Sequence, residues 1–280
     1  MFPLSAPGVT TPFALEECLQ VFKGLNWYIV PIFVILAYTI ANEIKAKRYS
    51  VVFGGIAFWL WDVFNETWNS MVYATTGQPV WGTTAAGNSA LQILIGYNIE
   101  ISIMFMFLGM FACKLLTTTD GYEGEKFFDG NKNWLNDPHN MYYKMNVRGK
   151  SLSKEEKKIK RNAVLNRIGV IVSGSILCVI VEILLNGCDV LTWEKAWWQP
   201  TFPFVLFIIG YVPFYVAAVV IHDLPRKKQL IGLGIIVLIV VTLLIVAGSM
   251  GMLGHQITVA ADGSWEWTGK WLKDGIELIR

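Results

Sequence analysis

Four polar residues, Asp62, Asn65, Glu66 and Asn69, lie inside an apolar stretch that is long enough to cross a membrane. Their spacing of i, i+3, i+4 and i+7 places all four side chains on one face of a helix. A carboxylate that faces lipid at mid-depth costs at least about 2.5 kcal/mol. We therefore expect this face to border the protein interior or a water-filled cavity, where carboxyl groups can transfer protons.

Two other apolar stretches also carry acids. Glu100 lies near the middle of the next stretch, with Tyr97 on the same face and Asn98 pointing elsewhere. Glu182 lies on the polar face of a later stretch, which also holds Asn186. The depth and the face of each acid predict that all of them border one shared cavity.

The acids predicted to be catalytic are Asp62, Glu66, Glu100 and Glu182. No basic residue falls in the middle of an apolar stretch, because Lys114 and Arg167 belong near the inner membrane surface. Acids without basic partners must share protons, bind a cation or reach water. We expect at least one of them to keep its proton at neutral pH and to serve as a general acid or a proton-relay station.

Amide and aromatic side chains on the same stretches are predicted to bind the substrate. Indole rings attract positive charge, so tryptophan walls beside a protonated acid favour chemistry that passes through a carbocation. Helix packing explains the same residues as well, because Asn side chains commonly hydrogen-bond between membrane helices. The predicted substrate-binding residues are Trp59, Trp61, Asn65, Trp68, Asn69, Tyr97, Asn98 and Asn186. Trp193 and Trp198, by contrast, are interpreted as membrane-interface anchors.

The composition indicates an all-α membrane protein with several spans. Hydrophobic residues make up 54% of the 280 residues and charged residues only 16%, with a mean hydropathy of +0.46. Soluble domains carry about 25% charged residues. A spanning helix needs about 20 apolar residues. Six stretches meet this requirement, at residues 25–44, 51–73, 90–115, 163–187, 202–222 and 229–252.

The distribution of Lys and Arg predicts the orientation of the six helices. Basic residues follow the first stretch, separate the fifth from the sixth, and gather in the 117–161 loop. Segment 76–88 has none, and segment 188–200 has only Lys195. Because cytoplasmic flanks collect Lys and Arg, we predict that the 117–161 loop lies inside and that both termini lie outside.

The predicted organisation has three parts. Residues 1–24 form an external amphipathic lead-in, residues 25–252 form the transmembrane domain, and residues 253–280 form an external element. Within the external element, two β-like runs around Asp262-Gly263 predict a hairpin. A short amphipathic helix is expected to follow the hairpin.

Two features concern the segments between the spans. Ser153 and Glu156 have capping-box spacing, which predicts a helix that begins there and continues into the fourth span. Cys18 and Cys188 are both expected outside the membrane, where they could form a disulfide bond.

One region resembles a known enzyme family. Basic residues end the first predicted span, Arg48-Tyr49-Ser50 follow, and the second span contains Trp61-Asp62. Over roughly residues 25–110, this pattern resembles the small transmembrane terpene cyclases of meroterpenoid pathways, and Asn98 is compatible with it. The resemblance implies that Asp62 is a catalytic acid that protonates an epoxide or alkene terminus of a prenyl chain.

The chain also departs from the terpene cyclase pattern. It has six predicted spans instead of seven, a long inner loop, and no acid in the last span. The second catalytic acid of that family is therefore missing from its usual place. Glu182 is the candidate to replace it.

Three classes of function fit these observations. An integral membrane enzyme would use the carboxyl groups as general acid and base on a lipid-like or isoprenoid substrate that enters from the bilayer. A proton- or cation-coupled transporter or channel would use the same acids as an ion pathway. A subunit of a membrane complex would pair them with basic residues of a partner chain.

The remaining expectations concern ligands and location. The three histidines are scattered along the chain and predict no metal centre, and no motif indicates a cofactor or a nucleic-acid partner. We expect a multi-pass protein of the cell membrane that contacts membrane lipids and an apolar small molecule. An oligomer or a partner subunit is compatible with the sequence.

Overall fold

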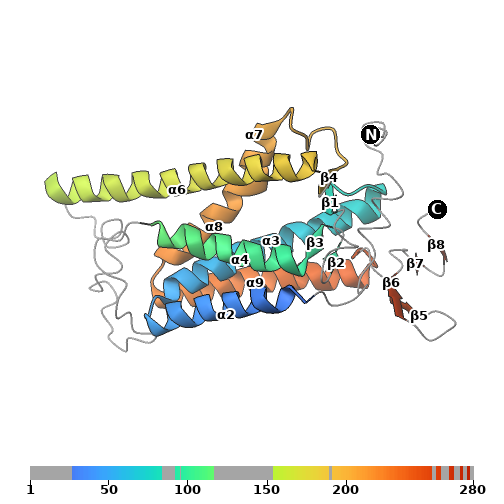
Figure 1. The fold of residues 1–280 in the computed structure, drawn as a ribbon, viewed down its shortest axis with the longest axis horizontal. Coiled ribbons are helices and arrows are strands. Elements are labelled where there is room, and N and C mark those ends of the chain that lie inside the picture. The colour runs from blue at the N-terminus through green and yellow to red at the C-terminus, as the bar shows by residue number, and fades with distance from the viewer. Residues whose placement is uncertain are drawn as a thin grey trace.

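A computed structural model describes residues 27–83, 92–94, 96–116, 154–188 and 191–253, and the backbone of four short strands between 257 and 277. Long helices run alongside one another, and the longest of them, α6, lies along one side of the others (Figure 1). The predicted lead-in, residues 117–153 of the predicted loop, and Cys18 fall outside the described residues.

The described helices are α2 (Ile29–Lys45), α3 (Tyr49–Thr76), α4 (Ile99–Lys114), α6 (Lys154–Gly187), α7 (Pro203–Val205), the π-helix η4 (Leu206–Tyr211), α8 (Val212–Asp223) and α9 (Arg226–Ser249). The described strands are β1 (Trp81–Thr83), β2 (Gln92–Leu94), β3 (Tyr97–Asn98), β4 (Leu191–Trp193), β5 (Ile257–Val259), β6 (Trp265–Trp267), β7 (Leu272–Lys273) and β8 (Ile276–Glu277). The fold is thus mainly helical, and α6 begins where the capping-box spacing predicted.

Three stretches within the described residues are long and apolar enough to cross a membrane: Arg161–Gly187, Pro203–Asp223 and Arg226–Ser249. They coincide with the fourth, fifth and sixth predicted spans. Helices α2 and α4 have 17 and 16 residues and rise roughly 25 Å at 1.5 Å per residue. This length is short of the roughly 30 Å of apolar bilayer thickness. Helix α3 has 28 residues, but carboxyl and amide groups interrupt its apolar sequence.

The third predicted span begins with strands instead of a helix. Strands β2 and β3 pair antiparallel, and α4 starts only at Ile99. Asn98 explains this boundary, because its side chain accepts a hydrogen bond of 2.8 Å from the backbone N–H of Ile101 and so caps the helix. The prediction that Glu100 lies near the middle of a span is therefore wrong, since Glu100 is in the first turn of α4.

The C-terminal region contains two pairs of short strands. Strands β5 and β6 pair antiparallel, which matches the hairpin predicted around Asp262-Gly263. The prediction of an amphipathic helix after this hairpin is wrong, because β7 and β8 pair antiparallel there. Asp274-Gly275 separates these two strands in the sequence.

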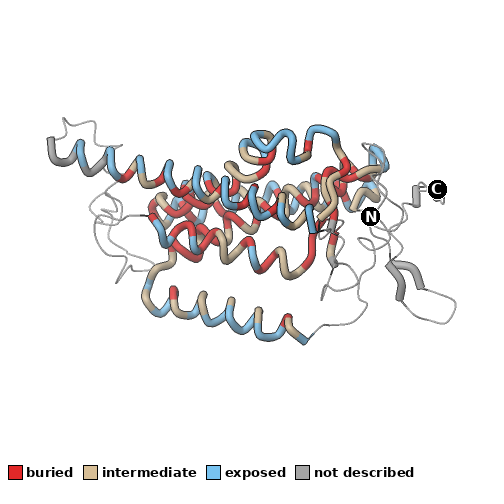
Figure 2. Tube along the Cα trace, turned by 45° about the horizontal axis from the view of Figure 1, so that its top comes forward, coloured by how far each residue is buried: buried red, intermediate tan, exposed pale blue. Residues whose placement is uncertain are grey.

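Helix α3 is the central helix, and it packs against α2, α4, α8 and α9. Glycine permits its close approach to α4. A Cβ atom on Gly55 would lie 2.4 Å from Met110 Cγ, and one on Gly109 would lie 2.4 Å from Phe58 Cβ. Buried residues gather where the helices face one another (Figure 2). Helices α2, α6 and α9, in contrast, expose large apolar side chains. Such exposed apolar faces are expected of helices that contact lipid.

Acids at one end of the protein, where α2 and α8 end and α3 begins, are paired with basic residues. Glu43 is 2% exposed and accepts hydrogen bonds from Arg48 and Lys114. Arg167 donates two hydrogen bonds, of 2.6 and 2.9 Å, to the carboxylate of Asp223. These contacts satisfy the buried charges at this end of the protein.

Candidate functional site

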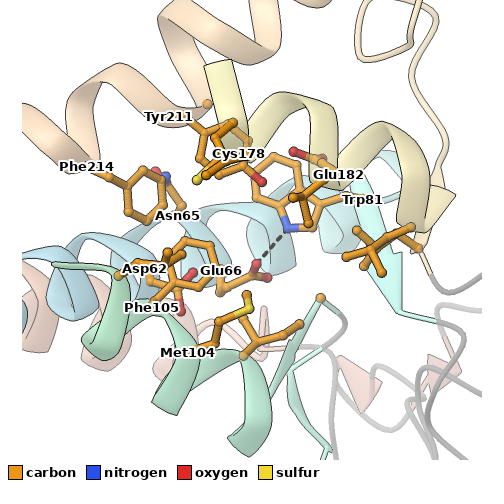
Figure 3. A pocket seen from close by; sticks show the side chains of 18 of the residues that line it. Asp62, Asn65, Glu66, Trp81, Met104, Phe105, Cys178, Glu182, Tyr211 and Phe214 are labelled. Atoms are coloured by element: carbon orange, nitrogen blue, oxygen red, sulfur yellow. Dashed lines mark hydrogen bonds between the residues drawn. The ribbon is translucent and has the colours of Figure 1, made fainter. Parts of the chain in front are cut away.

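A cavity of about 280 Å³ lies between α3, α4, α6 and the η4–α8 helix. Its polar lining consists of Asp62, Asn65 and Glu66 from α3, Cys178 and Glu182 from α6, and Tyr211 from η4. The acids of α3 and of α6 approach it from different sides (Figure 3). This volume is just below the roughly 300–1,000 Å³ range of small-molecule sites.

The three acids that line this cavity are buried and lack basic partners. Asp62, Glu66 and Glu182 are 2%, 5% and 7% exposed. No ion pair among the described residues involves any of them. Asp62 Oδ2 and Glu66 Oε2 are buried without a hydrogen-bond partner in the described part of the chain. Because an unpaired buried polar atom is costly, these oxygens require a proton, a water molecule or a ligand.

The position of the Glu66 carboxyl group depends on its neighbours in the connection that follows α3. The indole N–H of Trp81 donates a hydrogen bond of 2.7 Å to Glu66 Oε1. Gly96 packs directly against the other oxygen, because a Cβ atom there would lie 2.5 Å from Glu66 Oε2. A side chain at position 96 would therefore displace the carboxyl group.

Glu182 is held in a similar way by indole groups. Trp193 and Trp198 both donate to Glu182 Oε1, at 3.0 and 3.2 Å, and Tyr211 lines the same cavity. The interpretation of Trp193 and Trp198 as membrane-interface anchors is therefore wrong. Their indole groups point inward to an acid.

A cover over the cavity is formed by β1 and β4. These strands pair antiparallel, with Trp81 opposite Trp193, and they connect the segment after α3 to the segment after α6. The rings of Trp81 and Trp198 lie 5.0 Å apart. This arrangement was not predicted from the sequence, although each tryptophan follows an acid-bearing helix after a short connection, which is the available signal.

The most exposed residues of the cavity lining come from α4 and α6. Met104, Leu177 and Val181 line the cavity and are 41%, 57% and 41% exposed. All three side chains are apolar. The cavity therefore opens between α4 and α6, through an apolar mouth, toward the outer surface of the helices.

Aromatic rings close the side of the cavity that faces away from the β1–β4 cover. Phe105 and Phe214 line the cavity and lie 5.1 Å apart. Both pack on Phe58, at 5.7 and 5.1 Å between ring centres. This aromatic floor separates the three acids from the ion pairs at the other end of the protein.

Glu100 does not line this cavity, so the prediction of a four-acid site requires a correction. The hydroxyl group of Tyr28 donates a hydrogen bond of 2.6 Å to Glu100 Oε1. Glu100 borders a separate groove whose other lining residues are Ile32, Ile103, Met104, Phe107, Leu108 and Phe111. The error follows from the face of α4, because Glu100 lies on the face that borders the groove, whereas the next residue, Ile101, lines the cavity.

Most of the predicted substrate-binding residues also lie outside the cavity lining. The indole N–H of Trp59 donates to the Tyr97 hydroxyl at 2.9 Å and to Ser102 Oγ at 2.7 Å. Tyr97 in turn donates to Ser102 Oγ at 2.8 Å. This network links α3 to the start of α4. Asn98 caps α4, as described above, and none of these side chains lines the cavity.

The two remaining tryptophans of the prediction also lie away from the cavity lining. The ring of Trp61 stacks on Phe64 at 5.4 Å. Trp68 is 38% exposed, and its ring lies 6.1 Å from Trp81. Asn65 is the member of the predicted substrate-binding set that lines the cavity. The aromatic walls come instead from Trp81, Phe105, Trp198, Tyr211 and Phe214.

Asn69 and Asn186 hold the backbone of the cover instead of a substrate. Asn69 donates to Trp81 O and accepts from Val80 N–H, both at 2.7 Å. Asn186 donates to Leu191 O at 2.9 Å. Both amides therefore position the segments that carry the indole donors.

We expect Asn69→Leu to lower the free energy of unfolding by about 2–4 kcal/mol, because it leaves two backbone groups of the cover without partners. Thermal melting of the purified variant measures this effect. Asn65→Leu is the control, since Asn65 lies one helical turn away and makes no such backbone contacts among the described hydrogen bonds. Equal melting temperatures for Asn69→Leu and the wild type would contradict the assigned role.

The fold and the site together define a helical membrane protein with three buried carboxyl groups around an apolar cavity. Residues 11–135 and 141–249 match a family described as an uncharacterized membrane protein family, and the chain belongs to this family. An uncharacterized protein of Archaeoglobus fulgidus is 35% identical over 243 residues, which cover 85% of this chain and 97% of the relative. A comparison with solved structures gives no match.

Proposed function

We propose that the protein is a membrane-embedded enzyme that uses Asp62, Glu66 and Glu182 as general acids and bases on a lipid-like or isoprenoid substrate. One observation carries the proposal: buried carboxyl groups without basic partners face an apolar cavity whose mouth is also apolar. Carboxyl groups positioned in this way accelerate proton transfer by about 10²–10⁴-fold.

The proposal includes six membrane crossings in the cell membrane, with both termini and the β1–β4 cover outside. The paired basic residues near the opposite end support this orientation, because Lys and Arg collect on the cytoplasmic side. The short helices α2 and α4 are compatible with it, since a mismatch with the bilayer costs only fractions of a kcal/mol per Å.

The surroundings of each acid suggest different roles. Asp62 forms none of the described hydrogen bonds to an indole group and has an unpartnered oxygen beside the cavity, which suits a proton donor to the substrate. Glu182 accepts two indole N–H bonds and is therefore held as a proton acceptor. Glu66 lies between these roles, with one oxygen bound to Trp81 and the other without a partner.

The first chemistry to test is that of terpene cyclisation, in line with the sequence resemblance around Trp61-Asp62. In that reaction Asp62 would donate a proton to an epoxide or alkene terminus. The aromatic walls support the proposal, because ring faces stabilise the positive charge that forms on the carbon skeleton. A base, with Glu182 as the candidate, would then remove a proton from carbon.

Solvent deuterium provides a direct test of proton transfer. The purified protein is incubated in D₂O with linear isoprenoid alcohols, their epoxides or membrane lipids, and the products are measured by mass spectrometry. We expect protonation of an alkene to give a product that carries deuterium on carbon, and protonation of an epoxide to give a cyclised alcohol whose hydroxyl deuterium exchanges with the solvent. Absence of both product and deuterium from all three substrate classes would overturn the proposed function.

The proposed entry route through the membrane predicts the effect of blocking the mouth. Leu177→Trp should lower turnover of a membrane-dissolved substrate at least tenfold, because the larger side chain fills the opening between α4 and α6. Ile176→Trp is the matched control, since Ile176 is 47% exposed on the same helix and does not line the cavity. Equal turnover by the two variants would contradict entry between α4 and α6.

A proton- or cation-coupled transporter is the second candidate. The π-helix η4 beside the cavity favours it, because π-helical turns frequently mark functional sites and offer a point of conformational change. The aromatic floor argues against a continuous pore. Liposomes that contain the protein and a pH-sensitive dye separate the candidates, since a transporter produces proton flux and the proposed enzyme does not.

A further inference from the structure

We infer that the cavity binds an amphiphile with a positively charged head group, such as a long-chain ammonium compound. The inference rests on the proposed function in one respect, because the head group would lie where positive charge forms on the substrate after Asp62 has donated its proton. Three buried carboxyl groups face the cavity, and the described residues provide no ion pair for them. Asp62 Oδ2 and Glu66 Oε2 also lack hydrogen-bond partners there.

Aromatic rings around the same space supply a second kind of cation-binding group. Trp81 and Trp198 lie 5.0 Å apart on one side. Tyr211 and Phe214 lie 6.1 Å apart on another, and Phe105 is 5.1 Å from Phe214. Ring faces attract organic cations, and aromatic pockets of this kind recognise quaternary ammonium groups. Carboxyl groups and ring faces thus favour the same charge.

Other ligand classes fit the cavity less well. An anion would meet three acids without a described basic residue in the lining. A metal ion is disfavoured because the described residues contain no group of three His, Cys, Asp or Glu side chains that could hold one. A wholly neutral hydrocarbon would leave the buried carboxyl oxygens without partners, which is costly.

The requirement for an apolar tail follows from the mouth and from the neighbouring groove. A ligand enters past Met104, Leu177 and Val181, which are all apolar. Met104 and Leu108 of α4 line both the cavity and the groove that α4 forms with Ile32 of α2. Apolar surface therefore continues outside the cavity, where a hydrocarbon chain can lie while its head group contacts the acids.

Three probes test the inference on the full-length protein in neutral detergent at pH 7. Dodecyltrimethylammonium has both charge and tail, 1-dodecanol has the same tail without charge, and tetramethylammonium has the charge without the tail. Saturable binding is measured by equilibrium dialysis with radiolabelled probe. We expect dodecyltrimethylammonium to bind at least tenfold more tightly than either of the other two probes.

Variants locate the binding in the cavity. Asp62→Asn and Glu66→Gln should each weaken binding of dodecyltrimethylammonium at least tenfold, and thermal melting shows whether each variant remains folded. Glu100→Gln is the control, because Glu100 lies outside the cavity and accepts a hydrogen bond from Tyr28. If either cavity variant fails to fold, competition between unlabelled ammonium probe and 1-dodecanol on the wild type replaces it.

The outcomes separate this inference from the proposed function. Equal affinity for dodecyltrimethylammonium and 1-dodecanol would overturn it, and so would an equal loss of binding in Glu100→Gln. Deuterium transfer to a neutral substrate without ammonium binding would overturn the cation site and leave the enzyme. Ammonium binding without any product or deuterium transfer would support the cation site and contradict the enzyme.

Discussion

Asp62→Asn and Glu66→Gln should each reduce deuterium transfer from solvent to substrate at least 100-fold. Each substitution replaces a carboxyl group by an amide of nearly equal size, so the packing of α3 is retained while the exchangeable acid is lost. General acid–base catalysis contributes about 10²–10⁴ to the rate, which sets the expected loss. The measurement is the initial rate of deuterium incorporation by purified variants in lipid nanodiscs.

Stability should change little in these two variants or increase. Asp62 and Glu66 each have a buried oxygen without a partner among the described residues, so the native protein gains little from the charge of either group. Buried groups retained for activity commonly reduce stability. Glu100→Gln should keep full activity, because its carboxyl group lies outside the cavity. Full activity of both cavity variants would contradict the assignment of the acids.

The largest effect on stability is expected at the other end of the protein. Arg167→Met should lower the free energy of unfolding by about 3–5 kcal/mol, because it removes the bidentate partner of the buried Asp223 carboxylate and leaves it only the single contact of 2.9 Å with His222 among the described ion pairs. The two side chains are 9% and 13% exposed, so water screens this charge only weakly. Unfolding in mixed detergent micelles, followed by circular dichroism, measures the loss.

A double variant tests the physical reason for that loss. Arg167→Met combined with Asp223→Leu removes both charges and should recover most of the stability, since the replacement of a whole buried ion pair by apolar residues is often neutral. Lys114→Met should cost less than Arg167→Met, because the Lys114 side chain is 47% exposed and Glu43 retains Arg48. A double variant as unstable as Arg167→Met would show that packing, not charge, is the cause.

Helical periodicity predicted the part of the site that lies on continuous helices. Asp62 and Glu66 share a face of α3 because they are four residues apart. Glu182 shares the inward face of α6 with Cys178, which lies four residues before it. Each of the six apolar stretches likewise overlaps a described helix. Spacing along a regular helix fixes the direction of each side chain, so these predictions needed no tertiary information.

The parts that the sequence did not predict depend on how the helices pack and on the connections between them. Glu100 was misplaced because packing turns the face of Ile101, and not that of Glu100, toward the cavity. Trp81, Trp193 and Trp198 reach the acids only because β1 pairs with β4 across two separate connections. Such pairing depends on the arrangement of the helices, and its signal in the sequence is limited to the short connection between each acid-bearing helix and its tryptophans.

An experimental density map of the protein in a lipid nanodisc, at a resolution that shows side chains, tests the central claim most directly. The predicted result is that the carboxyl groups of Asp62, Glu66 and Glu182 face one hollow that opens between α4 and α6, with no Lys or Arg bound to them. Carboxyl groups that point into separate spaces would contradict the account. So would an arginine or lysine, from any part of the chain or from a partner subunit, bound to all three.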